Sequence, residues 1–309
     1  MNIKNTAISE SGNDFGELLN RWIAYLDTTP KTVDTYKKAM KQFVLWLESK
    51  GINEPIRADI IAYRDELKAK HKPSTVQLYV AAVKLFFRWT EQESLYPNIA
   101  DHIKGAKIDK EHKKDPLTSS QAGKVLCGID RTSTKGKRDY AILALMITTG
   151  LRTVSVINAD IGDIRTVADD TVLWYKGKGH DEKNVYVKLT EPVETAIREY
   201  LQARGEHSQE QPLFASESNR NSNGRMTTRS VSRLVKNHLA DVGLVSDRLT
   251  AHSLRHTAAT LNLLQGGSII ETQQLLNHSN INTTMIYAHA LERANNNSES
   301  RITAAIFGA

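Results

Sequence analysis

The spacing of apolar residues limits what this chain can fold into more than any other feature of its sequence. Up to residue 98, apolar residues recur at helical intervals, as in Leu18, Trp22 and Leu26, and no segment alternates as a strand does. The pattern predicts four amphipathic helices, at about 14–26, 32–50, 57–69 and from 75 onward. We expect residues 14–104 to form a compact, all-helical N-terminal domain.

Two residues mark helix ends within this domain. Gly51 follows the apolar stripe of the second helix, where a glycine in the left-handed conformation commonly closes a helix. Ser74 precedes the fourth helix and is expected to be its N-cap, because a serine hydroxyl can accept a hydrogen bond from an unpaired backbone N–H of the first turn.

A basic segment follows, and we assign residues 105–117 to a linker. The stretch from 104 to 116 contains few apolar residues, ends at Pro116 and carries five lysines: Lys104, Lys107, Lys110, Lys113 and Lys114. Two interpretations stay open, a solvated tether or a basic strap that lies along a polyanion.

The rest of the chain mixes helical patterns with one alternating region. Residues 171–175 and 184–189 alternate around a Gly-Lys-Gly turn, which predicts a small antiparallel β-sheet. Helices are predicted from Thr118 and at about 137–149, 192–204, 228–242, 253–264, 269–277 and 283–290. Residues 118–290 are expected to form a second, mainly α domain, and residues 291–309 form a tail.

Composition excludes several classes of protein. The chain has 41 Lys and Arg against 35 Asp and Glu, a net charge of +6 that suggests an anionic partner. Its single cysteine, Cys127, excludes a disulfide framework within the chain and a multi-cysteine metal site, and it fits a reducing compartment. The sequence shows no secretory signal and no stretch that could span a membrane, so we expect a cytoplasmic protein.

A cluster toward the C-terminus carries candidate chemistry. His252, Arg255 and His256 lie at positions i, i+3 and i+4, so they share one helix face. Histidines four residues apart can bind zinc, but no carboxylate ligand lies nearby in the sequence, which argues against a metal site. Taken alone, the cluster is more typical of surface histidines at the start of a helix.

Four further residues make this cluster a candidate active site. Arg152 ends a Thr-Gly-Leu-Arg motif, Lys178 lies in the hairpin turn, and His278 precedes Tyr287 by nine residues. Arginines can bind the non-bridging oxygens of a phosphodiester, a tyrosine hydroxyl can attack the phosphorus, and a lysine can protonate the departing oxygen. This set fits phosphoryl transfer to a protein hydroxyl, with arginines in place of a metal, and no nucleotide-binding loop is present.

Four short motifs follow one another between Thr118 and about His289: T-G-L-R, G-K-G, H-x-L-R-H and L-x-H-x-x-x-x-T-T-x-x-Y-x-H. In this order they resemble the motifs of the tyrosine recombinase (phage integrase) family. The resemblance implies a SAM-like, core-DNA-binding N-terminal domain and a catalytic C-terminal domain. It implies six catalytic residues: Arg152, Lys178, His252, Arg255, His278 and Tyr287. Tyr287 is the implied nucleophile, which forms a 3′-phosphotyrosyl link to DNA without a cofactor or a metal.

Two positions depart from the pattern of that family. Ser155 stands where the family usually has an acidic residue, three places after the first arginine, and we expect this change to affect stability more than chemistry. Asn277 replaces the usual glycine before His278. Asparagine tolerates a positive φ better than other non-glycine residues, so the turn is expected to form.

The resemblance also implies a partner and an assembly. The partner is double-stranded DNA with specific recombination sites, bound by a homotetramer in the synaptic complex, and the free protein is expected to be a monomer. Two biological roles stay open, an integrase of a phage or mobile element, which we favour slightly, and a Xer-like resolvase of replicon dimers. A type IB topoisomerase shares the chemistry, and a DNA-binding regulator without catalysis is disfavoured because all six catalytic positions are kept.

The tail has two parts with different character. A polar run, ERANNNSESR, precedes an apolar end that includes Ile302, Ile306 and Phe307. In the family that the chain resembles, this segment commonly docks on a neighbouring protomer. A frayed end and a plug that folds back on its own domain are the alternatives.

Overall fold

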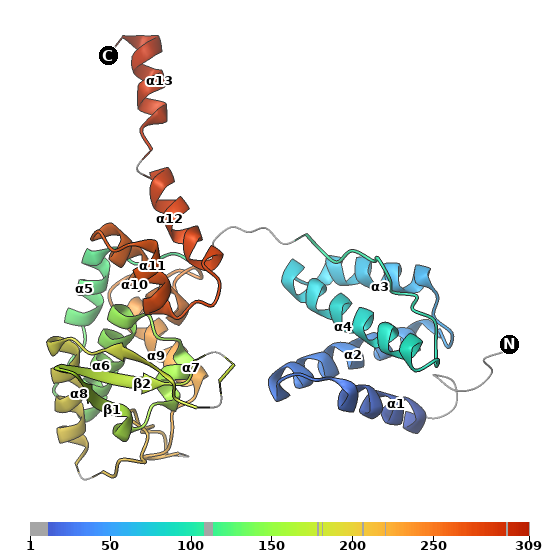
Figure 1. Ribbon diagram of the computed structural model, residues 1–309, viewed down its shortest axis with the longest axis horizontal. Helices are drawn as coiled ribbons and strands as arrows, with labels where there is room; N and C mark the ends of the chain where they lie inside the picture. Colours follow the sequence, from blue (N-terminus) through green and yellow to red (C-terminus); the bar gives the residue numbers. More distant parts are fainter. Residues whose placement is uncertain are drawn as a thin grey trace. The chain divides into compact units, whose positions relative to one another are not determined.

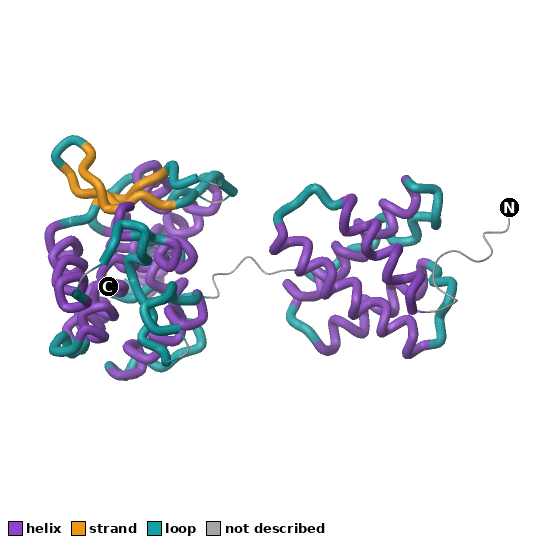
Figure 2. The backbone as a smooth tube through the Cα atoms, turned by 90° about the horizontal axis from the view of Figure 1, so that it is seen from below, coloured by secondary structure: helices purple, strands orange, loops and turns teal. Residues whose placement is uncertain are grey.

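The computed structural model describes residues 12–107, 114–177, 179–180, 182–205, 207–219, 221–294 and 296–308. The chain divides into two compact units, residues 1–111 and 112–309. Lys178 and residues 108–113 of the expected linker lie outside the described residues. The described part of both units is mainly helical, and its named strands form one small antiparallel sheet, which confirms the predicted fold class (Figure 2).

The described part of the N-terminal unit contains four helices (Figure 1): α1 (Gly12–Tyr25), α2 (Pro30–Lys50), α3 (Arg57–Lys70) and α4 (Pro73–Gln92). They match the four helices predicted from the apolar spacing, and Gly51 closes α2 at φ 65° as predicted. The prediction that Ser74 caps α4 is wrong, because the helix begins at Pro73 and Lys72 is its N-cap. Proline suits the first helical position, where its fixed φ fits the helix and its missing N–H would be unpaired.

Aromatic side chains form the centre of this unit. Trp22, Phe43, Phe86 and Phe87 are each at most 3% exposed. Their rings pack edge to face, with centroids 5.7 Å apart for Trp22 and Phe86 and 6.1 Å apart for Phe43 and Phe87. Each buried ring of this kind stabilises the fold by roughly 1.5–3 kcal/mol, so the aromatic core accounts for much of the packing between α1, α2 and α4.

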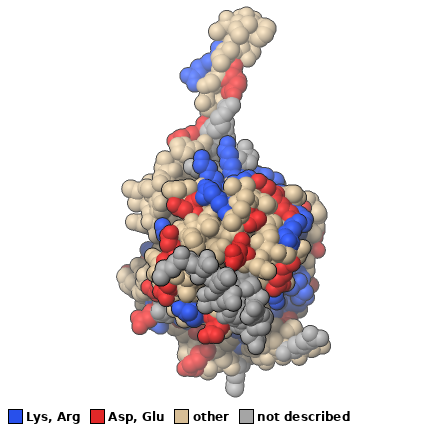
Figure 3. All heavy atoms as spheres, turned by 90° about the vertical axis from the view of Figure 1, so that its right-hand side faces the viewer, with Lys and Arg blue, Asp and Glu red and all other residues tan. Residues whose placement is uncertain are grey.

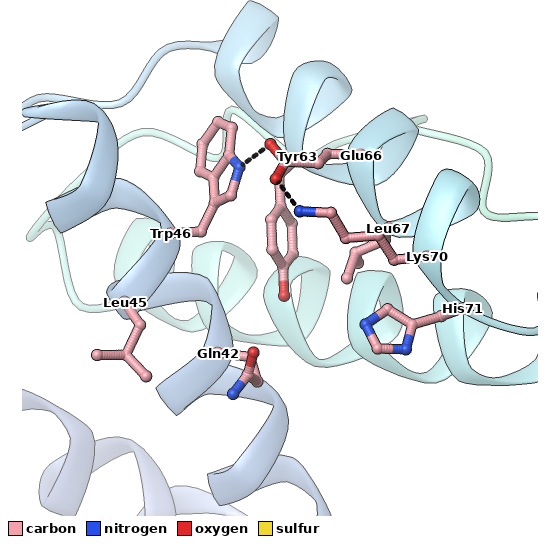
Figure 4. Close-up of a pocket in the computed structure, with 8 residues that line it drawn as sticks. All are labelled: Gln42, Leu45, Trp46, Tyr63, Glu66, Leu67, Lys70 and His71. Carbon is pink, nitrogen blue, oxygen red and sulfur yellow. Dashed lines mark hydrogen bonds and ion pairs between the residues drawn. The ribbon is translucent and has the colours of Figure 1, made fainter.

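A cavity of about 230 Å³ opens between α2 and α3 (Figure 4). On its wall, Trp46 Nε1 donates to Glu66 Oε2 at 2.7 Å, and Lys70 pairs with the same carboxylate at 2.6 Å. The bonds from Lys70 and Trp46 lower the pKa of Glu66 to about 2. Tyr63 also lines the cavity, its buried hydroxyl has no hydrogen-bond partner among the described residues, and burial raises its pKa. The bond from Trp46 to Glu66 therefore joins α2 to α3 beside this cavity.

One buried helix organises the C-terminal unit. α6 (Thr134–Thr149) buries every residue from 141 to 147, and it packs against α8 (Glu191–Arg204) and α10 (Ala251–Leu264). The other described helices are α5 (Ser119–Cys127), α7 (Thr153–Asn158), α9 (Thr228–Asp241), α11 (Ile269–Leu276), α12 (Asn282–Ala294) and α13 (Ser298–Phe307). Within the described part of the chain, no helix is both long and apolar enough to cross a membrane.

The antiparallel sheet lies at one side of these helices (Figure 2). Its strands, β1 (Ile164–Val167), β2 (Asp170–Tyr175) and β3 (Val185–Lys188), pair in the order β1-β2-β3. The predicted hairpin is confirmed, and Tyr175 faces Val185 in the last pair before its loop. The prediction lacks β1 and α7, because four and six residues are too few to show a period.

The tail contains a helix that its composition does not predict. α12 runs to Ala294, past the predicted end at 290, and α13 follows (Figure 1). No residue of α13 is buried, and Ile302, Ile306 and Phe307 are 59%, 66% and 77% exposed. The apolar end of the chain therefore has no partner among the described residues of its own unit.

Candidate active site

A tight turn after α6 delivers the first predicted site residue, Arg152. Gly150 is the C-cap of α6, with a left-handed φ of 64°, and Arg152 is the N-cap of α7 two residues later. A Cβ on Gly150 would lie 2.5 Å from Leu276 Cδ2 and 3.2 Å from the Cβ of Ala258. Glycine is thus required both for its backbone conformation and for close packing on α10 and α11, and the turn presents a half-buried Arg152 beside them.

Arg255, on α10, is held by two backbone carbonyls. Its side chain is buried, Nη1 donates to the Gly150 oxygen at 2.7 Å, and Nη2 donates to the Leu276 oxygen at 2.5 Å. Burial, and then the charge of Arg152, lower the pKa of Arg255 to about 10, so the guanidinium stays protonated at neutral pH. Arg255 therefore joins the turn after α6 to the end of α11 and fixes its own orientation.

The turn between α11 and α12 places His278. Asn277 closes α11 with φ 47° and ψ 58°, which confirms that asparagine supplies the left-handed turn. His278 Nδ1 lies 2.9 Å from the Thr284 hydroxyl in the first turns of α12. Burial, and then Arg255 and Arg152, lower the pKa of His278 to about 4, so its imidazole is neutral at neutral pH.

Tyr287 lies on α12 and faces inward. It is 6% exposed, and its ring packs against His256 with centroids 5.2 Å apart. Burial raises the pKa of the phenol, while the charges of Arg255 and Arg152 lower it. The positive charges of both predicted arginines therefore act on the phenol of Tyr287.

The two histidines of α10 have different surroundings. His252 is exposed at the start of the helix, and its ring meets that of His256 edge-on at 4.7 Å. His256 is buried between His252 and Tyr287, where it packs rather than faces solvent. The charge of His252 also contributes to the low pKa of His278, so the structure brings His252 near the other predicted residues.

The hairpin loop reaches the same turn, although Lys178 itself lies outside the described residues. Gly177, directly before it, is buried, and a Cβ placed there would lie 3.2 Å from Asn277 Nδ2. Lys176, the other lysine of this loop, is exposed. The described part of the loop therefore lies next to the residue that precedes His278.

Tyr175 also belongs to this region, although the sequence gives no sign of it beyond its place at the end of β2. We class it from the sequence with the tyrosines that only pack, together with Tyr186 and Tyr200. Burial raises the pKa of Tyr175, and Arg255, Arg152 and a hydrogen bond from the Asn277 side chain lower it. The side chain of Tyr175 is therefore a neighbour of the two arginines and of Asn277.

Among the described residues, no group of three or more His, Cys, Asp and Glu side chains could hold a metal ion. The site instead gathers two arginines, the neutral imidazole of His278 and a phenol. Cations of this kind bind an anionic group such as a phosphodiester, and the phenol can attack it.

The model of the phage integrase family matches residues 116–293, and the model of the N-terminal SAM-like domain of phage integrases matches residues 18–96. The chain belongs to the phage integrase family. It is a tyrosine recombinase, as the four motifs predict. The two matched segments cover most of the two compact units.

Curated relatives agree with this assignment, and a solved structure has a similar fold. The chain is 30% identical over 285 residues to a tyrosine recombinase XerC of Herpetosiphon aurantiacus, covering 88% of this chain and 90% of the relative. It is 37% identical over 176 residues to XerC of Caldanaerobacter subterraneus, but the match covers 56% of this chain and about half, 46%, of that relative. The fold is similar to that of XerH site-specific recombinase bound to a palindromic difH substrate in a post-cleavage complex (TM-score 0.73, 20% identity, 99% and 92% of the two chains).

Proposed function

We propose that this tyrosine recombinase cleaves and rejoins DNA at specific sites through a 3′-phosphotyrosyl link to Tyr287, without a metal or a nucleotide. One observation carries the proposal: Tyr287 is buried in one cluster with Leu276, whose carbonyl accepts a hydrogen bond from Arg255, and the charges of Arg255 and Arg152 act to lower the pKa of its phenol. A phenol near two guanidiniums is a nucleophile placed where a phosphodiester would be bound and its charge offset.

The proposed cleavage step exchanges one bond to phosphorus for another. The Tyr287 oxygen bonds to the phosphorus while the bond from phosphorus to the 5′ oxygen breaks. The phenol gives its proton to a neutral imidazole, and Lys178 gives a proton to the departing 5′ oxygen, since an alkoxide leaves poorly. Rejoining is the reverse reaction, in which the 5′ hydroxyl of a partner strand attacks the phosphotyrosine.

The histidines suit the role of proton acceptor. His278 is neutral at neutral pH because its pKa is about 4, and a bound phosphodiester brings negative charge that raises this value. His252 is exposed beside it and completes the set of groups around the phosphate. We assign proton transfer to His278 and contact with the phosphate to His252.

The proposed partner is double-stranded DNA, with the N-terminal unit in the major groove. Gln77, Lys84 and Arg88 recur at helical spacing on α4 and line a cavity of about 370 Å³. Amide and guanidinium groups can read base edges, so this row is the candidate reading face. Lys and Arg are interspersed with Asp and Glu on the face that Figure 3 shows, so binding is proposed to rest on selected basic residues.

The proposed assembly is a tetramer on DNA, because recombination needs two cuts on each of two duplexes. α13 supports it, since its apolar residues are exposed and none of them is buried against the described residues of their own unit. We propose that α13 docks on a neighbouring protomer in the synaptic complex. Because the substrate is DNA, the proposed site of action is the cytoplasm.

Two biological roles share this chemistry. Integration of a phage or mobile element is the first, and resolution of replicon dimers is the second. The second is favoured by the names of the two relatives, each called XerC.

A different test distinguishes recombination from topoisomerase action. One plasmid carries two direct copies of the site and another carries a single copy, and only recombination requires a pair of sites.

Covalent capture from randomised duplex DNA tests the proposed function. The wild-type chain is mixed with the duplexes, the mixture is denatured, and DNA that stays attached to protein is amplified and sequenced. We expect a single family of sites after repeated rounds, and we expect two such sites to recombine without a metal or a nucleotide. Attachment that stays random in sequence would contradict site-specific recombination.

A further inference from the structure

Asn277 does more in this chain than close α11. Its backbone has the left-handed conformation that a glycine would supply at no cost. Its side chain, which glycine lacks, lies against the hairpin loop, because a Cβ on Gly177 would be 3.2 Å from Asn277 Nδ2. Gly177 is buried at this contact and directly precedes Lys178 in the sequence.

Tyr175 makes the second part of the contact, from the end of β2. It is 4% exposed and lines the same cavity as Asn277, and a hydrogen bond from the Asn277 side chain offsets part of the rise that burial causes in its pKa. It also forms the last sheet pair before the loop, with Val185. Asn277 therefore contacts the hairpin at two points, Tyr175 and Gly177, which lie two residues apart.

The side chains beside this contact are not closely packed. A cavity of about 240 Å³ lies there, lined by Trp174, Tyr175, Asn184, Val185, Tyr186, Gln274 and Asn277. A cavity supplies no van der Waals contact, so the attachment of the hairpin to α11 depends more on the contacts of Asn277 with Tyr175 and Gly177.

We propose that Tyr175 and Asn277 are positioning residues that anchor the hairpin at Gly177 and so set where Lys178 presents its amine to the departing 5′ oxygen. The proposal rests on the proposed function, because it assumes that Lys178 is the general acid. Asn277 then has two roles: its backbone orients His278, and its side chain holds the hairpin.

Four variants of the full chain and two leaving groups test this role. Asn277→Gly keeps the left-handed turn and removes the side chain, Tyr175→Phe keeps the ring and removes the hydroxyl, and Lys178→Ala removes the general acid. Tyr186→Phe, on the same hairpin and 43% exposed, is the matched control. Single-turnover cleavage is measured on a nicked duplex of the captured site, with either oxygen or sulfur at the bridging 5′ position.

A thiolate leaves without a proton, so a defect exerted through Lys178 disappears with sulfur. We expect Asn277→Gly and Tyr175→Phe each to slow cleavage of the oxygen duplex about 10-fold, as a misplaced catalytic group does, and to leave the sulfur duplex within about twofold of wild type. In the Lys178→Ala background, neither change should slow cleavage further. Tyr186→Phe should match wild type on both duplexes.

Three results would overturn the account, in distinguishable ways. Equal slowing on oxygen and sulfur would place the effect on Tyr287, the arginines or the fold, and would overturn the positioning role alone. Wild-type rates on the oxygen duplex in both variants would do the same. A wild-type chain that forms no covalent adduct with any duplex would overturn the proposed function, and this inference with it.

Discussion

The two arginines of the site are held by the protein in different ways. Arg255 is buried and donates to two backbone carbonyls, so its guanidinium is oriented before DNA arrives. Arg152 is half-buried at the N-cap of α7, where its side chain is less constrained. Donors that are already oriented stabilise developing charge without a cost of reorganisation, so Arg255 is expected to contribute to both the fold and the reaction.

Replacing either arginine by lysine should remove most of the cleavage activity. Lysine keeps the charge but lacks the planar pair of donors, and loss of one positioned donor costs about 2.7–4 kcal/mol of barrier, or roughly 100- to 1,000-fold in rate. Arg255→Lys should also lower the melting temperature, because the Gly150 and Leu276 carbonyls lose their donors, whereas Arg152→Lys should not. Single-turnover cleavage and thermal unfolding measure the two effects. Wild-type rates in both variants would remove these arginines from the site.

The pKa of His278 predicts a dependence of stability on pH. Between pH 6.5 and about 4, the unfolded chain protonates this histidine and the folded chain does not. The unfolded state then binds more protons, so the contribution of His278 to stability falls as the pH drops through this window and is constant above it. The melting temperature of His278→Gln should therefore fall less than that of wild type when the pH is lowered from 7.5 to 5. Parallel losses in the two proteins would show that the folded histidine titrates normally.

How far the sequence predicts the site differs from residue to residue. The order of the motifs is enough to propose Arg152, Arg255 and Tyr287, because each motif places a reactive group at a local turn or on one helix face. Tyr175 has no such motif. Its place beside Asn277 arises only when β2 and α11 pack together, which a period in the sequence does not reveal.

At the scale of elements, the site depends on left-handed helix ends that meet. Gly150 caps the C-terminus of α6 and Asn277 that of α11, and the Leu276 side chain lies directly beside Gly150. Arg255 bonds to a carbonyl at each of these ends. A change in either end should therefore move the arginine.

Gly150→Ala tests the close packing of these ends. The left-handed backbone costs alanine about 1–2 kcal/mol, and the clash with Leu276 adds about 1–3 kcal/mol as in other overpacked cores. Gly51→Ala is the matched control, because Gly51 has φ 65° but no atom near its added Cβ. Denaturant unfolding should show a larger loss of stability for Gly150→Ala. Equal losses would mean that Leu276 moves aside freely.

Most helices can be predicted because their apolar residues keep one period over 13 or more residues. Short elements such as β1 and α7 cannot, since their positions are set by the neighbours on which they pack. The start of α4 shows a different limit: Pro73 occupies the first helical position, so the cap is Lys72 and the nearby serine lies inside the helix.

At the scale of the whole molecule, we propose that the tail packs against another protomer. Ile302, Ile306 and Phe307 are exposed on α13, and burying such side chains stabilises an interface by about 1.5–3 kcal/mol each. Docking of the tail on a second protomer would therefore stabilise the assembly.

Deleting residues 298–309 should leave binding to a single site intact and reduce cooperative assembly and recombination. The reason is that the deletion removes α13 and no residue of the proposed active site. Gel mobility of one-site and two-site duplexes, with a recombination assay on the same DNA, measures the three properties. A truncated chain that assembles and recombines as well as the full one would show that α13 does not join protomers.

Locating the covalent link to DNA tests the central claim most directly. Trypsin cuts after Arg255 and Arg293, and the peptide between them, 256–293, contains one tyrosine, Tyr287. After cleavage of a nicked duplex and nuclease digestion, we predict that mass spectrometry finds the phosphonucleotide on this peptide in wild type and no adduct in Tyr287→Phe. An adduct on peptide 166–176, which carries Tyr175, or one that persists in Tyr287→Phe, would contradict the account.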